Sequence, residues 1–143
     1  MKASHALTVL VSALALLAFA PPESWADPRR DALLAELLTQ AKKEEPGLAR
    51  FSAERGATFY RATHKGGKPG TASCTACHGG SPQEKGKTRA GKDIDPMAVS
   101  KTPTRYTDRE DVEKWFTRNC NDVLGRACTT REKGDFITYM LGQ

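Results

Sequence analysis

The sequence is poor in aromatic residues, histidine and cysteine, and it lacks the patterns of a β protein. Aromatic residues make up 7% of its 143 residues, which leaves few large rings for a core built from side chains alone. No segment alternates apolar and polar residues over the length of a strand, which excludes a β-sandwich or a β-barrel. No internal repeat is present, which excludes a solenoid. We therefore expect an all-α fold with extended loops.

The sequence also lacks an apolar run long enough to span a membrane. Its longest such run, Leu7–Ala20, has fourteen residues, whereas a spanning helix needs about 20. Lys2 precedes this run and Ser24-Trp25-Ala26 follows it, which is the pattern of a secretory signal peptide cleaved at the end of that triplet. We expect 1–26 to be a signal peptide and 27–143 to form one exported domain, periplasmic in a bacterium.

Neither sign of charge dominates the chain. The 22 Lys and Arg residues exceed the 17 Asp and Glu residues by five. The signal peptide contains one basic and one acidic residue, Lys2 and Glu23, so its removal leaves the net charge at +5. This charge is too weak and too dispersed to indicate nucleic-acid binding. It suits either a solvated, lysine-rich surface or docking to an acidic partner or an anionic surface, peripheral to a membrane at most.

Four helical segments are expected. The first begins at Asp27-Pro28, an N-cap followed by a first-turn proline, and ends before Pro46-Gly47. The second begins after Ser52 and contains Gly56, which costs about 1 kcal/mol inside a helix. A close crossing with another helix would explain that glycine.

The third and fourth segments each begin with a capping box. The third opens with Thr107-Asp108-Arg109-Glu110 and the fourth with Thr129-Thr130-Arg131-Glu132. Apolar residues follow at helical spacing in both segments. They are Val112, Trp115 and Phe116 in the third, and Phe136, Ile137, Met140 and Leu141 in the fourth.

The sequence Cys74-Thr75-Ala76-Cys77-His78 is a C-x-x-C-H motif, and it carries the most specific chemistry in the chain. Its two thiols can each add across one vinyl group of a haem, and its histidine can ligate the iron from one side. A dithiol redox motif would need a surrounding βαβ pattern, and a zinc site would need four ligands. We therefore predict one covalent haem c, held by Cys74 and Cys77, with His78 as the proximal axial ligand. The second ring nitrogen of His78 is expected to donate to a backbone carbonyl.

The segment from Gly79 to Tyr106 has 28 residues and no apolar period. So long an irregular connection is uncommon in a compact domain. A haem would give this segment a large apolar surface to wrap, which the few aromatic residues could not replace. The expected architecture is therefore a small class I type cytochrome c fold.

The remaining cysteines, Cys120 and Cys128, lie eight positions apart. In an exported protein a disulfide is the expected state of such a pair. Closing so short a loop stabilises a fold by about 2–3 kcal/mol in the chain-entropy model. The disulfide would restrain Asn119, the residue immediately before it.

Four residues are candidates for the sixth coordination position of the iron. Met97 leads from the residues alone, because it lies downstream of the haem motif beside Pro96, where electron-transfer cytochromes carry a ligand methionine. Met140 falls on the apolar face of the last helix and is expected in the core. His64 lies in a flexible loop and is expected on the solvated surface. Asn119, judged from the residues alone, is interpreted as the end of the third helix.

Several short motifs keep a characteristic order and spacing over roughly residues 51–141. They are Gly66–Pro69, Ser73–Gly79, Thr88–Lys92, Val112–Trp115, Arg118–Asn121, Val123–Arg126 and Cys128-Thr129. Together they resemble the sphaeroides haem protein family of monohaem cytochromes c. In that family the sixth ligand is an asparagine immediately before a disulfide cysteine. The resemblance therefore implies Asn119 as distal ligand and a disulfide between Cys120 and Cys128.

The resemblance also implies a function. An amide oxygen is a hard, weak donor that suits ferric but not ferrous iron, so reduction would loosen Asn119. The resemblance implies that oxygen or nitric oxide binds at the released position, and that a dihaem cytochrome c or a membrane cytochrome b supplies the electron. The alternative is a pure electron carrier with His78 and Met97 ligating in both states, since a thioether holds both and raises the potential. The sequence assigns no catalytic residue and leaves open whether gas binding leads to turnover.

Overall fold

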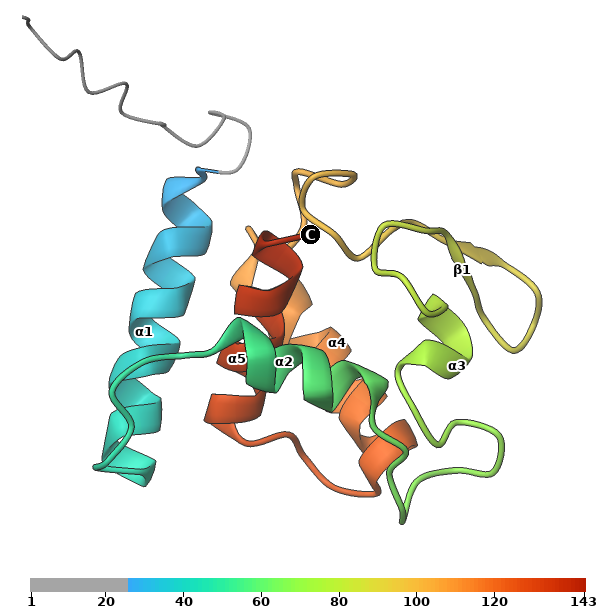
Figure 1. The fold of residues 1–143 in the computed structure, drawn as a ribbon, viewed down its shortest axis with the longest axis horizontal. Helices are drawn as coiled ribbons and strands as arrows, with labels where there is room; N and C mark the ends of the chain where they lie inside the picture. Colours follow the sequence, from blue (N-terminus) through green and yellow to red (C-terminus); the bar gives the residue numbers. More distant parts are fainter. Residues whose placement is uncertain (1–25) are drawn as a thin grey trace, which may run out of the picture.

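The computed structural model describes residues 26–143, so the expected signal peptide, apart from Ala26, lies outside the described residues. Five helices and a small hairpin follow one another along the chain (Figure 1). The helices are α1 (Pro28–Glu44), α2 (Ala53–Arg61), α3 (Thr75–His78), α4 (Arg109–Leu124) and α5 (Thr130–Leu141), and the strands are β1 (Gly86–Lys87) and β2 (Asp93–Ile94). The two strands pair antiparallel, with Gly86 opposite Ile94.

All four expected helices are confirmed, but one cap differs. The side chain of Thr129 accepts from the amide of Glu132, whose own side chain returns the bond, so the capping box of α5 is confirmed. The capping box predicted at Thr107 is wrong, because the N-cap of α4 is the next residue, Asp108, and the helix begins at Arg109. The carboxylate of Asp108 accepts from the amide of Asp111 at 2.9 Å, and a charged acceptor suits the positive end of the helix dipole.

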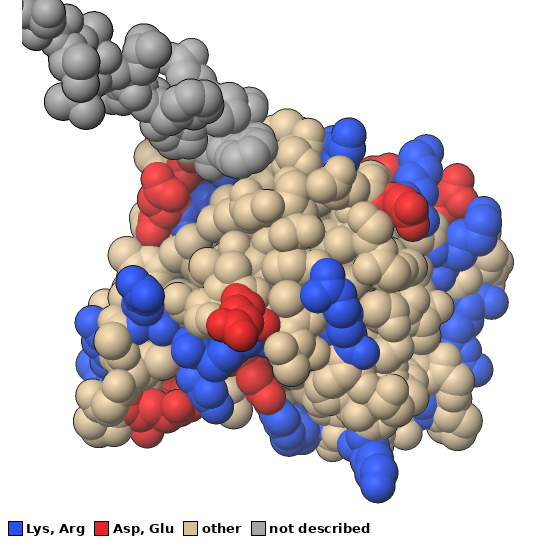
Figure 2. Space-filling model, in the orientation of Figure 1, with Lys and Arg blue, Asp and Glu red and all other residues tan. Residues whose placement is uncertain are grey.

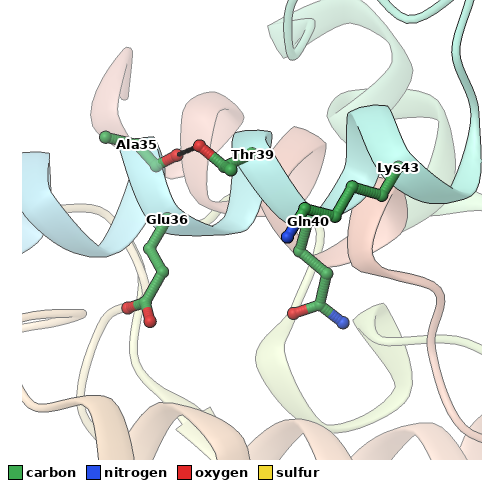
Figure 3. Close-up of a pocket in the computed structure, with 5 residues that line it drawn as sticks. All are labelled: Ala35, Glu36, Thr39, Gln40 and Lys43. Atoms are coloured by element: carbon green, nitrogen blue, oxygen red, sulfur yellow. Dashed lines mark hydrogen bonds between the residues drawn. The ribbon is translucent and has the colours of Figure 1, made fainter.

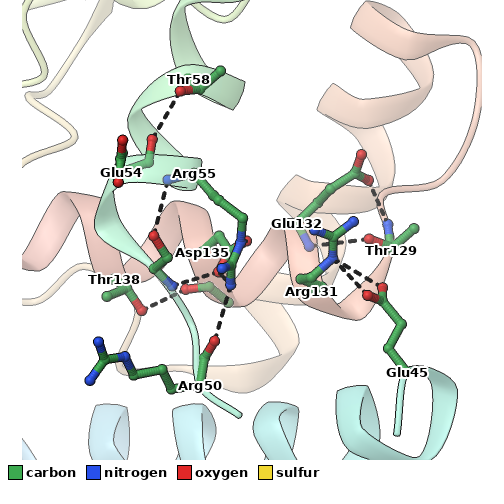
Figure 4. Close-up of polar contacts among 12 residues, drawn as sticks. Glu45, Arg50, Glu54, Arg55, Thr58, Thr129, Arg131, Glu132, Asp135 and Thr138 are labelled. Atoms are coloured by element: carbon green, nitrogen blue, oxygen red, sulfur yellow. Dashed lines mark hydrogen bonds and ion pairs between the residues drawn. The ribbon is translucent and has the colours of Figure 1, made fainter. Parts of the chain in front are cut away.

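Helix α2 crosses α5 at close range, as Gly56 predicted. A Cβ at this position would overlap the carbonyl group of Asp135 and lie 2.8 Å from the Cβ of Tyr139. Asp135 is 3% exposed, and its carboxylate accepts from the Ser52 amide at 2.7 Å and from the guanidinium of Arg55 (Figure 4). The buried carboxylate is therefore paired, and it fixes the start of α2 on α5.

The apolar core lies where α1, α2, α4 and α5 meet. Its buried members are Leu33, Leu37, Tyr60, Met97, Val112, Phe136, Ile137, Tyr139 and Met140. The ring of Phe136 packs against those of Tyr60, Tyr106 and Phe116, with centroids 5.5–6.3 Å apart. Helix α3 and the hairpin contribute no buried residue to this cluster. They form the opposite wall of the cavity described below, on the right in Figure 1.

The segment from Gly79 to Tyr106 is mostly irregular, as expected, but it includes the β1–β2 hairpin, which was not predicted. The two strands together hold only four residues, so the chain is mostly helical with long loops. Within the described range 26–143, every helix is too short or too polar to cross a bilayer.

Candidate functional site

A cavity of about 1030 Å³ separates α3 and the hairpin from α2, α4 and the core. This volume exceeds the range of about 300–1000 Å³ that is usual for small-molecule sites. Its wall is mainly apolar and includes Phe59, Val112, Phe116 and Phe136. The cavity therefore suits a large, flat, apolar group.

A smaller hollow of about 480 Å³ is lined by residues of α1 alone (Figure 3). Its lining residues are Ala35, Glu36, Thr39, Gln40 and Lys43. The Thr39 hydroxyl donates to the Ala35 carbonyl, an ordinary contact within a helix. The hollow contains neither cysteine nor histidine, so the large cavity is the candidate functional site.

The haem motif lies on the wall of the large cavity. Cys74 precedes the single turn of α3, and Cys77 and His78 follow within it. Both cysteines are free thiols and half-buried. Burial raises the pKa of the Cys74 thiol to about 11. Burial first, and then the charge of Arg105, lowers the pKa of His78 to about 4, so its imidazole is neutral and able to ligate a metal at neutral pH.

The hydrogen bond expected at the second ring nitrogen of His78 is absent. Nδ1 is buried, and it has no partner among the described residues. The carbonyls of His78 itself and of the next residue, Gly79, accept from the Tyr60 hydroxyl at 3.2 and 2.8 Å.

Two residues that the sequence did not single out for this role fix α3. Tyr60 is fully buried on α2, and its hydroxyl bonds tie the end of α3 to the helical core. Gly86, in β1, packs against the backbone of α3, because a Cβ there would overlap the carbonyl oxygen of Cys77. No local sequence signal marks Gly86, because a glycine is needed there only through its contact with α3.

Asn119 lies on α4 and lines the same cavity, and its side chain is exposed there. Its side chain makes no hydrogen bond to any other residue in the described part of the chain. The interpretation of Asn119 as the end of a helix is wrong. Helix α4 continues to Leu124 and ends at Gly125, whose φ of 68° provides the left-handed cap. Asn119 therefore has no capping role.

Cys120 and Cys128 form a disulfide with their Cα atoms 5.6 Å apart. Both residues are buried, and they pack with Leu124 against Phe59 and Phe116. The disulfide joins α4 to the start of α5, and it restrains the helix at the residue that follows Asn119.

The other three candidates for the sixth position lie in different surroundings. Met97 lines the cavity, but it is 8% exposed and belongs to the core, and its carbonyl accepts from the Tyr106 hydroxyl. Met140 is fully buried in the core, as expected, and does not line the cavity. The expectation of a solvated His64 is wrong, because this residue is half-buried, with its ring 5.2 Å from that of Phe59. It too lies outside the cavity.

Two arginines that the sequence analysis missed shape the loop above the haem motif. Arg105 lines the cavity, and its guanidinium donates to the carbonyls of Pro96 and Asp95 at 2.9 and 2.7 Å. Arg30, fully buried on α1, donates to the carbonyls of Arg105 and Pro103. Both side chains therefore organise backbone that surrounds the cavity.

The residues present fit a covalent haem. Two free thiols and a histidine that is neutral at neutral pH share one wall of a large apolar cavity. Across residues 26–143, no three side chains of His, Cys, Asp or Glu gather closely enough to hold a metal by themselves. The donor set is thus one histidine on one wall, with Asn119 and Met97 elsewhere on the cavity surface.

Comparisons with known proteins agree with this fit. A family model described as "Domain of unknown function (DUF1924)" matches 46–140. The cytochrome c-type protein SHP of Cereibacter sphaeroides is 52% identical over 91 residues, which are 64% of this chain and 70% of that protein. Cytochrome c'' of Methylophilus methylotrophus is 39% identical over 87 residues, 60% of each chain.

Solved structures give the same result. The structure of oxidised SHP, described as an oxygen-binding cytochrome c, superposes with a TM-score of 0.69 and 45% identity, covering 77% of this chain and 96% of that one. Oxidised cytochrome c'' from Methylophilus methylotrophus superposes with a TM-score of 0.66 and 32% identity, covering 79% and 93%. A solution structure of that cytochrome, whose stated subject includes haem-ligand detachment, superposes with a TM-score of 0.68. The expected class I type cytochrome c fold is therefore confirmed.

Proposed function

Because this chain belongs to the sphaeroides haem protein family of c-type cytochromes, with covalently bound haem, we propose specific roles for the residues of its cavity. Cys74 and Cys77 attach the haem, and His78 ligates the iron from the α3 side. The support is positional, since all three side chains line the cavity and the thiols are free. When bound, the haem supplies an iron that changes its preferred ligands between the ferric and ferrous states.

Asn119 is the distal ligand in this proposal. Its side chain is exposed on the cavity wall, has no competing hydrogen bond among the described residues, and adjoins the disulfide. Met97 is the weaker candidate, because leaving the core would cost the burial of a nearly complete methionine side chain, about 1.5–3 kcal/mol. The unbonded Asn119 amide on the cavity wall is the observation that carries the proposal.

The proposed function is binding of a diatomic gas after reduction. Asn119 would hold the ferric iron through its amide oxygen and would be released on reduction, because a hard, neutral oxygen donor binds ferrous iron poorly. The reduced haem would then offer that position to oxygen or nitric oxide. Two features of relatives support this: one is described as oxygen-binding, and another as undergoing haem-ligand detachment. The second candidate is a pure electron carrier with Met97 as permanent ligand, supported by the position of Met97 on the cavity wall.

Spectra of two single variants test the assignment. Asn119→Val should change the ferric absorption spectrum, because valine cannot ligate and the sixth position loses its protein ligand, while Met97→Leu should leave the spectrum unchanged. The wild-type ferrous protein should be high-spin and take up carbon monoxide on mixing. Optical absorption in both oxidation states measures each of these outcomes.

The carrier would be established by the opposite pattern. A ferric sulfur-to-iron charge-transfer band, lost in Met97→Leu, together with a ferrous form inert to carbon monoxide, would exclude Asn119 as ligand. That result would also exclude the proposed gas-binding function, which depends on ligation by Asn119.

We further propose that the protein works in the periplasm after export and receives its electron from an acidic dihaem cytochrome c or from a membrane cytochrome b. Lys and Arg side chains gather at the right edge of the molecule, where the β1–β2 hairpin lies (Figures 1 and 2). The exposed basic residues of this segment are Lys85, Lys87, Arg89 and Lys92. Arg89 and Lys92 also line the cavity, so positive charge adjoins the place where the haem edge would lie.

Salt should slow reduction by such a donor. Charge steering is screened within a Debye length, about 10 Å at 0.1 M salt, so the second-order rate of reduction should fall about tenfold or more between 0.02 and 0.5 M salt. The double variant Arg89→Gln, Lys92→Gln should show a weaker dependence, whereas Lys42→Gln, on α1, should match the wild type. Stopped-flow mixing with a purified dihaem cytochrome c measures the rate. A rate indifferent to salt would remove the role assigned to the basic edge.

A further inference from the structure

The last turn of α4 is held by a loop that leads into the haem motif. The amide of Lys68 donates to the Asp122 carbonyl at 2.7 Å, and the Lys68 ammonium pairs with the Asp122 carboxylate at 2.5 Å. The Thr71 hydroxyl reaches the same carbonyl at 2.7 Å. We call this set of contacts, between residues 66–71 and 121–125, the clasp.

The clasp depends on glycines at its points of closest approach. A Cβ at Gly67 would meet the backbone of Asp122 and Val123, with the Val123 carbonyl carbon at 2.5 Å. A Cβ at Gly125 would meet the backbone of Gly66, with its carbonyl carbon at 2.7 Å. Two backbones therefore pack directly on each other, which leaves the helix end little room to shift.

Thr71 is the buried centre of the clasp. It is 5% exposed and lines the cavity, and its single hydroxyl proton is shared between the carbonyls of Asp122 and Lys68, at 2.7 and 2.8 Å. The Asp122 carbonyl is one of the last in α4, and such groups need partners from outside the helix. The clasp supplies two of these partners, so removing the Thr71 hydroxyl weakens a buried bond rather than a solvated one.

We propose that the clasp is a positioning device for Asn119. Asn119 and Asp122 lie three residues apart on α4 and so share a face of the helix. The loop that holds Asp122 runs on through Ser73 to Cys74, the first attachment cysteine. The clasp thus connects the segment that would attach the haem to the part of α4 that contains the proposed distal ligand.

This arrangement confines the release of Asn119 to its side chain. The disulfide restrains the helix at residue 120, and the clasp restrains it at residue 122, so the backbone of α4 would stay in place when the amide leaves. The inference rests on the proposed ligation by Asn119. It adds that the ferric bond would owe part of its strength to a loop that, among the described residues, is hydrogen-bonded to neither Asn119 nor His78.

Thr71→Val tests the device, because valine keeps the shape of threonine and removes the hydroxyl. The ratio of Asn119-bound to unbound ferric protein should fall about fivefold, the factor that corresponds to one typical hydrogen bond. Since Asn119 favours the ferric state, the reduction potential should rise by about 40 mV, which is that factor converted at 59 mV per tenfold change for one electron. Optical redox titration measures both quantities.

Thr138→Val is the matched control. Thr138 is half-buried, and its hydroxyl donates to the Gly134 carbonyl at 2.7 Å, but it lies outside the cavity. Its removal should leave the potential unchanged. A second variant, Asp122→Asn, keeps the backbone hydrogen bonds and loses the ion pair with Lys68. It should raise the reduction potential by less than Thr71→Val does, and it replaces Thr71→Val as the test if that variant does not fold.

The possible failures are distinguishable. If Asn119→Val alters the ferric spectrum but Thr71→Val and Asp122→Asn keep the wild-type potential, ligation stands and the clasp is merely structural. If Asn119→Val leaves the ferric spectrum unchanged, the ligation itself is wrong, and the positioning role falls with it.

Discussion

Gly86→Ala is expected to abolish stable haem incorporation. The alanine Cβ would overlap the carbonyl oxygen of Cys77 and lie 2.9 Å from the Cα of His78. Both are backbone atoms, so no side-chain rotation relieves the overlap, and α3 must move away from β1. Overpacking usually costs about 1–3 kcal/mol, and backbone contacts this close should reach the upper end of that range. The displaced turn carries two of the three residues that would hold the haem.

Haem content per polypeptide, from the alkaline pyridine spectrum, measures the effect, and thermal unfolding of the purified protein supports it. Gly80→Ala is the matched control, because a Cβ at Gly80 meets nothing within 4 Å and its backbone does not need a left-handed conformation. This variant should incorporate haem normally. Equal haem content in both variants would show that the contact between β1 and α3 does not position the motif.

Removing the disulfide by the double change Cys120→Ala, Cys128→Ala should have the second large effect. A loop of this length contributes about 2.5 kcal/mol to the free energy of unfolding through the entropy of the unfolded chain. The same change releases the helix beside Asn119, so the ferric absorption spectrum should also shift toward that of Asn119→Val. Stability and spectrum should therefore change together.

Urea unfolding measures the first quantity and optical absorption the second. Asn119→Val, which keeps the disulfide, separates them, because it should alter the spectrum while the midpoint of unfolding stays close to wild type. If the double variant loses stability but keeps the wild-type ferric spectrum, the disulfide stabilises the fold without positioning the ligand.

Local signals in the sequence predicted the helices well. Gly56 is an instructive case, since a residue unfavourable in a helix indicated a close crossing, and Asp135 of α5 lies at that point. The cap at Asp108 was missed by one residue, because Thr107 and Asp108 both have side chains that can cap and only the observed backbone distinguishes them. The residues of the predicted apolar face of the third helix differ in their burial. Val112 is buried, whereas Trp115 is 47% exposed on the cavity wall.

Contacts between distant segments could not be predicted in the same way. The C-x-x-C-H motif identified the cofactor, but the support of α3 by Tyr60 and Gly86 depends on how α2 and β1 pack against it. Asn119 was misinterpreted from its residue type, because asparagine often ends a helix and the signal of Gly125 lies six residues further on. Only the resemblance to the sphaeroides haem protein family, carried by the whole set of motifs, pointed to Asn119 as the proposed distal ligand.

Helix α1 has a consequence for where this protein can be cut. The family match begins at residue 46, after α1 has ended, yet Leu33 and Leu37 of that helix belong to the core. Arg30 also holds the backbone of Pro103 and Arg105, next to the cavity. A shortened expression product that starts at residue 46 would expose the apolar surface beneath α1 and leave those carbonyls without their buried donor. The segment that the family model matches is therefore shorter than the segment that forms the core.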